Sequence, residues 1–175
     1  LSFLPWAHSF GQTVEFHTLI SYGASMGIAE SVDKLIDNLS EVQPTLLFSV
    51  PRIFNRIYDG LNKKMAAGSP VARGLFNAAI SNAKLRRELA AQGKTSLAAE
   101  LKHRVLDGLV FSKVRARLGG RLRYAFSGGA AISREVAEFI DNVGITVYEG
   151  YGLSETSPIC TANYPDNQRI GSVGK

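Results

Sequence analysis

Short apolar runs alternate with helix-like segments along most of this chain, and that alternation restricts its fold more than any other feature. Strand-like runs are expected at residues 1–4, 23–28, 45–50, 121–126 and 145–148, with helices at 9–20, 31–40, 51–65 and 133–143. Pro51 suits a first helical turn, Ser133 suits an N-cap, and Gly144 suits a helix end. Because strands separated by helices pair in parallel, the sequence predicts an α/β fold, a mainly parallel sheet with helices on both faces.

The middle of the chain breaks this alternation. Residues 66–117 are rich in Ala, Leu, Lys and Arg without a strand signal, which predicts a helical excursion from the sheet. The positive charge also gathers here, since residues 63–107 carry nine Lys and Arg against three Asp and Glu in a chain of net charge +5. We favour a solvated helical pair; the alternative is contact with an anionic membrane through Lys84, Arg86 and Arg87. Nucleic acid is not expected as a partner, because the basic residues are not interleaved with aromatic ones and no nucleic-acid-binding fold is indicated.

Size and cysteine use place further limits. With 175 residues and 45% hydrophobic content, the chain can form one domain or one compact piece of a larger one. It starts inside an apolar run without Met or an export signal and stops at GSVGK, so we expect residues 1–175 to be a single partial domain. Cys160 alone cannot form an internal disulfide, which favours a reducing, cytoplasmic location. No apolar stretch reaches the roughly 18 residues that a membrane span needs.

Two loops are expected to face each other at one edge of the sheet. SGGAA at 127–131 and EGYGLSE at 149–155 each follow the carboxyl end of a strand, where open α/β sheets bind ligands. Gly128 and Gly129 let backbone N–H groups approach a ligand closely, and the next helix offers a positive N-terminus. A glycine pair is also the usual residue type of a plain strand-to-helix turn, and that alternative stays open.

The second loop supplies groups that would suit a nucleotide with its metal. Tyr151 offers an aromatic face for a base, Ser154 a donor for a phosphate oxygen, and Glu155 an oxygen ligand of the kind Mg²⁺ prefers. Each also has a structural alternative: a core tyrosine, a turn-capping serine and a solvated glutamate. The chain contains no GxGxxG, Walker or GxSxG motif, and its three histidines lack zinc-site spacing.

These segments together resemble the AMP-forming adenylate-forming enzymes. YGLSET at 151–156 resembles their YGxTE motif with Ser in place of Thr, and SGGAAIS at 127–133 is similar to SGGAPL. LPWAHSFG at 4–11 is similar to LPxxHxxG, and GSVGK at 171–175 to the start of the next motif. VPRIFNRIYDG at 50–60, the helical excursion and residues 107–130 are most similar to the long-chain fatty acid–CoA ligases.

The resemblance implies an ATP-dependent ligase acting in two steps. A fatty acid attacks the α-phosphate of ATP with release of pyrophosphate, and the thiol of coenzyme A then displaces AMP. It also implies site roles: adenine stacking for Tyr151, α-phosphate binding for Ser154, Mg²⁺ binding for Glu155, and a place near the reacting carboxylate for His8. The nucleotide-binding set is completed by backbone contacts of Gly128, Gly129, Ala130 and Gly152. Without the resemblance, His8 is as well explained as a helix cap.

Several parts of the family's site fall outside this chain. The family's phosphate loop should precede Leu1, and its ribose-binding Asp, hinge and adenylation Lys should follow Lys175. We therefore expect little turnover from residues 1–175 alone. Two alternatives stay open: a related enzyme that adenylates another carboxylic acid, and a non-catalytic nucleotide-binding module.

Overall fold

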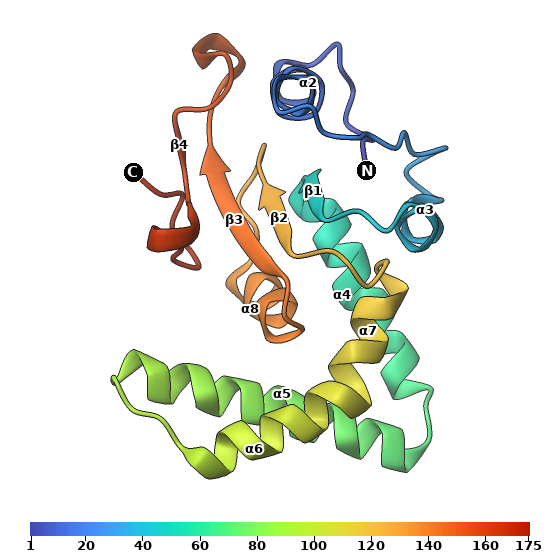
Figure 1. Cartoon of the computed structure of the whole chain (residues 1–175), viewed down its shortest axis with the longest axis vertical. Coiled ribbons are helices and arrows are strands. Elements are labelled where there is room, and N and C mark those ends of the chain that lie inside the picture. Colours follow the sequence, from blue (N-terminus) through green and yellow to red (C-terminus); the bar gives the residue numbers. More distant parts are fainter.

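The computed structural model describes residues 1–175 and is built around a four-stranded sheet of order β1-β2-β3-β4 (Figure 1). Strands β1 (Leu46–Ser49), β2 (Tyr124–Ser127) and β3 (Thr146–Tyr151) run parallel, whereas β4 (Thr161–Ala162) pairs antiparallel with the end of β3. All helices of the excursion lie between β1 and β2, and α8 (Arg134–Asn142) connects β2 to β3. The mainly parallel α/β sheet predicted from the alternation is confirmed.

The other helices follow the predicted order with two π-helical segments. Before the sheet lie α1 (Ser9–Gly11), η1 (π, Gln12–His17), α2 (Thr18–Ser21) and α3 (Leu35–Val42). The long crossover contains α4 (Pro51–Ala66), α5 (Pro70–Ala91), α6 (Leu97–Leu106), η2 (π, Asp107–Phe111) and α7 (Ser112–Arg117). Short 3₁₀ turns, η3 (Ser154–Thr156) and η4 (Pro165–Asn167), complete the chain. The helical excursion is therefore confirmed, and α4 ends at the residue where the excursion was expected to begin.

Local signals in the sequence set several of these boundaries. Pro51 stands in the first turn of α4, and the Ser133 hydroxyl accepts a hydrogen bond from the Val136 N–H at 3.3 Å as the N-cap of α8. Gly144 follows α8 with a φ of 93°, a left-handed conformation that glycine adopts without the steric cost paid by other residues. These three predictions are confirmed.

Helices cover both faces of the sheet, as predicted. Leu47, Ala125 and Val147 point to one face and belong to the main core with α3, α4 and α8. On the opposite face, Phe48 packs in a small separate cluster with Leu4 and Val14, which lie before and within the η1 segment. Figure 1 shows α2 above the strands and α5 with α6 at the opposite end of the molecule. The N-terminal helical segment and the helical excursion therefore lie at opposite ends of the molecule.

Two predicted strands are wrong. Residues 1–4 and 23–28 form only an isolated parallel bridge between Ser2 and Ile28. The cause is the buried side chain of Glu15, whose carboxylate accepts hydrogen bonds from the backbone N–H groups of Phe3 and Leu4. Those donors are no longer available for a strand ladder. Two further boundaries differ: α3 starts at Leu35 rather than at residue 31, and β3 continues to Tyr151 because β4 pairs with it.

The basic residues named for membrane contact do not form one exposed patch. Arg86 pairs with Glu100 at 2.7 Å, and Arg87 lies 3.2 Å from both Glu138 and Asp141. These two arginines join helices to one another, so of the three named residues only Lys84 makes no ion pair within the chain. No helix is both long enough and apolar enough to cross a bilayer.

Candidate functional site

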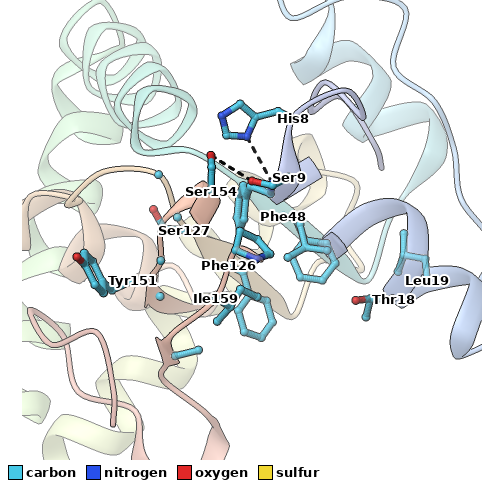
Figure 2. Close-up of a pocket in the computed structure, with 18 of the residues that line it drawn as sticks. His8, Ser9, Thr18, Leu19, Phe48, Phe126, Ser127, Tyr151, Ser154 and Ile159 are labelled. Carbon is cyan, nitrogen blue, oxygen red and sulfur yellow. Dashed lines mark hydrogen bonds between the residues drawn. The ribbon is translucent and has the colours of Figure 1, made fainter. Parts of the chain in front are cut away.

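A cavity of about 450 Å³ lies between the N-terminal helical segment and the face of the sheet that carries Phe48 and Phe126. This volume falls within the range of about 300–1,000 Å³ that is usual for small-molecule sites. Its walls are mostly apolar: Val14 and Leu19 come from the helical segment, while Phe48 and Phe126 come from β1 and β2. The two phenylalanine rings stack with their centroids 5.3 Å apart, and Figure 2 shows them inside the cavity. The cavity is suited to an apolar group with a polar end.

The polar end is formed where the loop after β3 meets the start of α1. The Ser9 hydroxyl donates to the Ser154 hydroxyl at 3.4 Å, and His8 lies beside them (Figure 2). All three residues line the cavity. The chain thus brings together a histidine and two hydroxyls from segments that are 145 residues apart at the Ser9–Ser154 contact.

The loop itself depends on one close backbone approach. A Cβ on Gly152 would lie 1.6 Å from the carbonyl oxygen of Pro158, so no other residue fits there without moving the backbone. Thr156 closes the turn, because its hydroxyl accepts from the Leu153 N–H at 3.0 Å and donates to a nearby carbonyl. Tyr151 ends β3 with half of its surface exposed and lines the cavity, which rules out the core alternative for this ring.

The turn after β2 brings its glycines to the cavity. Gly128 is buried against the Phe10 ring, where a Cβ would approach ring carbons to 2.7 Å. Gly129 has a φ of 79°, again a conformation that favours glycine. Both glycines line the cavity, but Ala130 is exposed and does not. The pair therefore does more than turn the chain: it lets the Phe10 ring and the cavity come close to the backbone.

His8 also acts as a helix cap, which was the structural alternative to a role in the site. Its Nδ1 accepts a hydrogen bond from the Phe10 N–H at 3.4 Å and caps α1, while the ring stays exposed at the cavity. The position of His8 depends on the preceding segment, which is held by Glu15. That carboxylate is fully buried and accepts from the Ser2 hydroxyl at 2.5 Å, from the backbone of Phe3 and Leu4, and from the Trp6 indole.

Glu155 lies outside the cavity lining. Its side chain is exposed on the η3 turn beside Ser154, and no other acidic, histidine or cysteine side chains gather there in a cluster able to hold a metal ion. The arrangement fits Mg²⁺ only in the manner typical of nucleotide enzymes, in which one or two carboxylates and the substrate phosphates share the ion. Glu155 is the residue that could hold it.

Three polar residues at the cavity or beside it were missed in the sequence. Ser9 and Ser127 line the cavity, and the Ser127 Oγ is buried without a hydrogen-bond partner. Glu149 is buried opposite Ser127 across β2 and β3, and accepts from the Gly171 N–H at 3.2 Å. Burial raises the pKa of the Glu149 carboxyl, and the Gly171 hydrogen bond opposes that rise. The available signal was position, since Ser9 and Ser127 stand inside matched motifs and Glu149 lies two residues before one.

Comparison with known proteins decides the family. A model of the family described as "AMP-binding enzyme" matches residues 1–175. This chain is a member of the AMP-binding enzyme family. The adenylate-forming resemblance drawn from the four motifs is thereby confirmed.

Curated relatives of this AMP-binding protein are longer enzymes. It is 36% identical over 178 residues to the long-chain-fatty-acid–CoA ligase FadD15 of Mycobacterium bovis, covering 100% of this chain and 29% of that protein. It is 36% identical over 176 residues to the peroxisomal long chain acyl-CoA synthetase 6 of Arabidopsis thaliana, covering 99% of this chain and 24% of the relative. The chain thus spans 24–29% of the length of these relatives.

Solved structures agree on the fold. The AMP-binding chain matches a benzoate CoA ligase of Burkholderia xenovorans LB400 with a TM-score of 0.58 and 19% identity, covering 97% of this chain and 25% of that one. It matches the A domain of a carboxylic acid reductase from Segniliparus rugosus, solved with AMP and a co-purified carboxylic acid, with a TM-score of 0.52 and 26% identity. That match covers 89% of this chain and 20% of the reductase chain.

Proposed function

We propose that residues 1–175 form part of the large N-terminal domain of a ligase that joins long-chain fatty acids to coenzyme A by way of an acyl-adenylate. The observation that carries the proposal is the cavity: apolar walls of Phe48, Phe126 and Leu19 lead to a polar end made by His8 and Ser154. An aliphatic chain fits the first part, and a carboxylate beside a phosphate fits the second. The names of the curated relatives at about 35% identity support the long-chain substrate.

The nucleotide is proposed to bind along the rim formed by the two loops. The exposed face of Tyr151 would stack on adenine, and the Ser154 hydroxyl would donate to an α-phosphate oxygen. Gly128, Gly129 and Gly152 would allow close backbone contact, since side chains at these positions are excluded or strained. Ala130 lies beyond the cavity, so its proposed contact is limited to a part of the nucleotide that projects from it.

The chemical task of this site would be to bring two anions together. A fatty acid is ionised near neutral pH, so attack on the α-phosphate needs no general base, and positioning with charge stabilisation carries the reaction. His8 is already oriented by its hydrogen bond to the Phe10 N–H, which leaves the other ring nitrogen to face the reacting carboxylate. Ser9 would hold Ser154 in place until phosphate replaces that contact. A magnesium ion held by Glu155 would supply charge neutralisation on the phosphates.

Coenzyme A as the second substrate and a cytoplasmic location are also parts of the proposal. The first rests on the family, and the second rests on the single cysteine. The relatives' greater length supports the proposal that the chain is one part of a longer enzyme. On that basis residues 1–175 assayed alone are expected to show little turnover.

The test is ATP–pyrophosphate exchange by the full-length polypeptide, driven by a ladder of acids from acetate through aryl acids to long-chain fatty acids. Exchange should peak with the long chains. Ser154→Ala should lower exchange about 100-fold or more, the usual effect of removing one donor to developing charge. Tyr151→Ala should raise the KM for ATP about tenfold through lost stacking. Tyr164→Ala is the matched control, because Tyr164 is 49% exposed against 50% for Tyr151 and lies outside the cavity lining.

Two outcomes would replace the proposal. Exchange that peaks with aryl or short acids would favour a related enzyme for another acid. A folded polypeptide that binds ATP without exchange, and that is unaffected by Glu155→Gln, would be a nucleotide-binding module.

A further inference from the structure

A π-helical turn lies where the N-terminal segment meets the cavity. At the end of η1 the Thr18 N–H bonds to the carbonyl of Thr13, five residues earlier, and the Thr18 hydroxyl donates to that same carbonyl at 2.7 Å. One carbonyl oxygen therefore accepts both the backbone and the side-chain donor of Thr18. Because π-helical turns are rare and recur at functional sites, a turn held in this way is a candidate for a role in the site.

The π turn decides which side chains of the segment reach the cavity. One residue inserted into a helix rotates the part after it by about 100° relative to the part before it. Val14, within the turn, packs with Leu4 and Phe48, and Leu19, after the turn, packs against the same cluster. A return to α-helical geometry would displace the side chains after the turn by one position, and Leu19 would leave this cluster.

Thr18 and Leu19 belong to the apolar part of the cavity. Both line it, and Figure 2 shows them on the side away from Tyr151, with Ser154 between. Thr18 brings a hydroxyl into this wall, but its single donor is already used by the Thr13 carbonyl. The hydrogen bond therefore holds the shape of the wall and also leaves no free Thr18 donor facing an aliphatic ligand.

We propose that Thr18 is a positioning residue for the acid substrate. Its hydroxyl holds the π turn, and the turn holds Val14 and Leu19 in the wall that the aliphatic part of the acid contacts. The inference rests on the proposed function, because it assigns the apolar part of the cavity to the acid. Since Thr18 acts on binding of the acid and not on the reacting atoms, loss of its hydroxyl raises KM for the acid without lowering kcat.

The test is ATP–pyrophosphate exchange by the full-length polypeptide, with KM measured separately for ATP and for the acid that the wild type prefers. Thr18→Val nearly keeps the side-chain shape and removes the hydroxyl. We expect the KM for the acid to rise about fivefold to tenfold, the net value of one hydrogen bond, and the KM for ATP and kcat to change less than about twofold. Thr18→Ser keeps the hydroxyl and should restore the wild-type KM. Exchange with acetate, which has no chain to place against this wall, should not respond.

Ser21→Ala is the matched control. Ser21 lies on α2 together with Thr18, and its hydroxyl donates to the His17 carbonyl at 2.8 Å, but Ser21 lies outside the cavity lining. Removing this hydrogen bond should leave both KM values unchanged. Circular dichroism checks folding of each variant. Should Thr18→Val fail to fold, Thr18→Ala against Thr18→Ser gives the same comparison.

An unchanged KM for the acid in Thr18→Val overturns the inference. An equal rise in the KM for ATP, the same rise in Ser21→Ala, or loss of folding in both variants without the hydroxyl also overturns it, since each would mark a general structural role. The proposed function fails separately. A wild type that prefers aryl acids refutes the long-chain substrate, and the role of Thr18 is then judged by the KM for that acid. A wild type without exchange is judged by the dissociation constant of the long-chain acid, and an acid that does not bind overturns both.

Discussion

Replacing Glu15 tests the view that one buried carboxylate holds the segment that presents His8. Glu15 is 0% exposed and accepts from the Ser2 hydroxyl at 2.5 Å, the Leu4 N–H at 3.1 Å and the Phe3 N–H at 3.2 Å. Glu15→Ala removes the acceptor and leaves these donors buried without partners. Each such donor costs about 1–3 kcal/mol, and local relaxation recovers part of the sum, so we expect a total loss of about 3–5 kcal/mol.

Glu15→Gln separates hydrogen bonding from packing. Glutamine keeps the size of the side chain but has one acceptor oxygen, so we expect an intermediate loss of about 1–3 kcal/mol. The free energy of unfolding is measured by urea titration followed by circular dichroism, with linear extrapolation to water. Glu41→Ala is the control, because Glu41 is exposed on α3, and its effect should stay within about 0.5 kcal/mol. A loss below about 1 kcal/mol in Glu15→Ala would refute the reasoning.

Three further substitutions test the loop and the titrating groups. Gly152→Ala should move the backbone at Pro158 and lower pyrophosphate exchange about 100-fold, whereas Gly60→Ala, with open space around it, should not; equal activities would contradict the packing argument. Arg115 holds the pKa of Asp107 below its usual range, so the stabilisation exists above the ordinary carboxyl pKa and is lost as pH falls through the lowered value. Asp107→Asn should therefore flatten the acid-side fall in the urea midpoint, and an unchanged slope would count against it. Burial raises the pKa of Glu149, so wild-type stability should fall as pH rises from the ordinary carboxyl pKa through the raised one. Glu149→Gln should remove that fall, as read from the same titration; a persisting fall would assign it elsewhere.

The sheet could be predicted because its signals are local. Pro51, Ser133 and Gly144 each act within one helical turn, and β1, β2 and β3 are apolar runs between such signals. The two wrong strands failed because a distant side chain, Glu15, occupies the N–H groups that a ladder would need. The extension of β3 to Tyr151 depends on pairing with Thr161, which no pattern within the strand itself reveals.

The site divides in the same way. Gly128 and Gly152, which approach other atoms closely, could be predicted as site residues because glycine is the residue type that permits such an approach. Ser9 and Ser127 were missed, because a hydroxyl becomes part of a cavity only through the folding of segments far apart in the sequence. The ion pairs of Arg86 and Arg87 could not be predicted for a related reason: composition gives the charge of a segment, whereas helix packing decides which cations are already paired.

Trp6 gives the molecule a fluorescent probe in a different place from the helices that dominate its circular dichroism. Trp6 is the single tryptophan of the chain, packs on the Phe16 ring at 5.2 Å and donates to Ser2 and Glu15. Its fluorescence therefore reports on the segment before α1. Far-ultraviolet circular dichroism is instead dominated by the longest helices, α4 and α5, which lie in the crossover. Coincident transitions by the two probes would show one cooperative unit, and separate transitions would show that the histidine-bearing segment opens by itself.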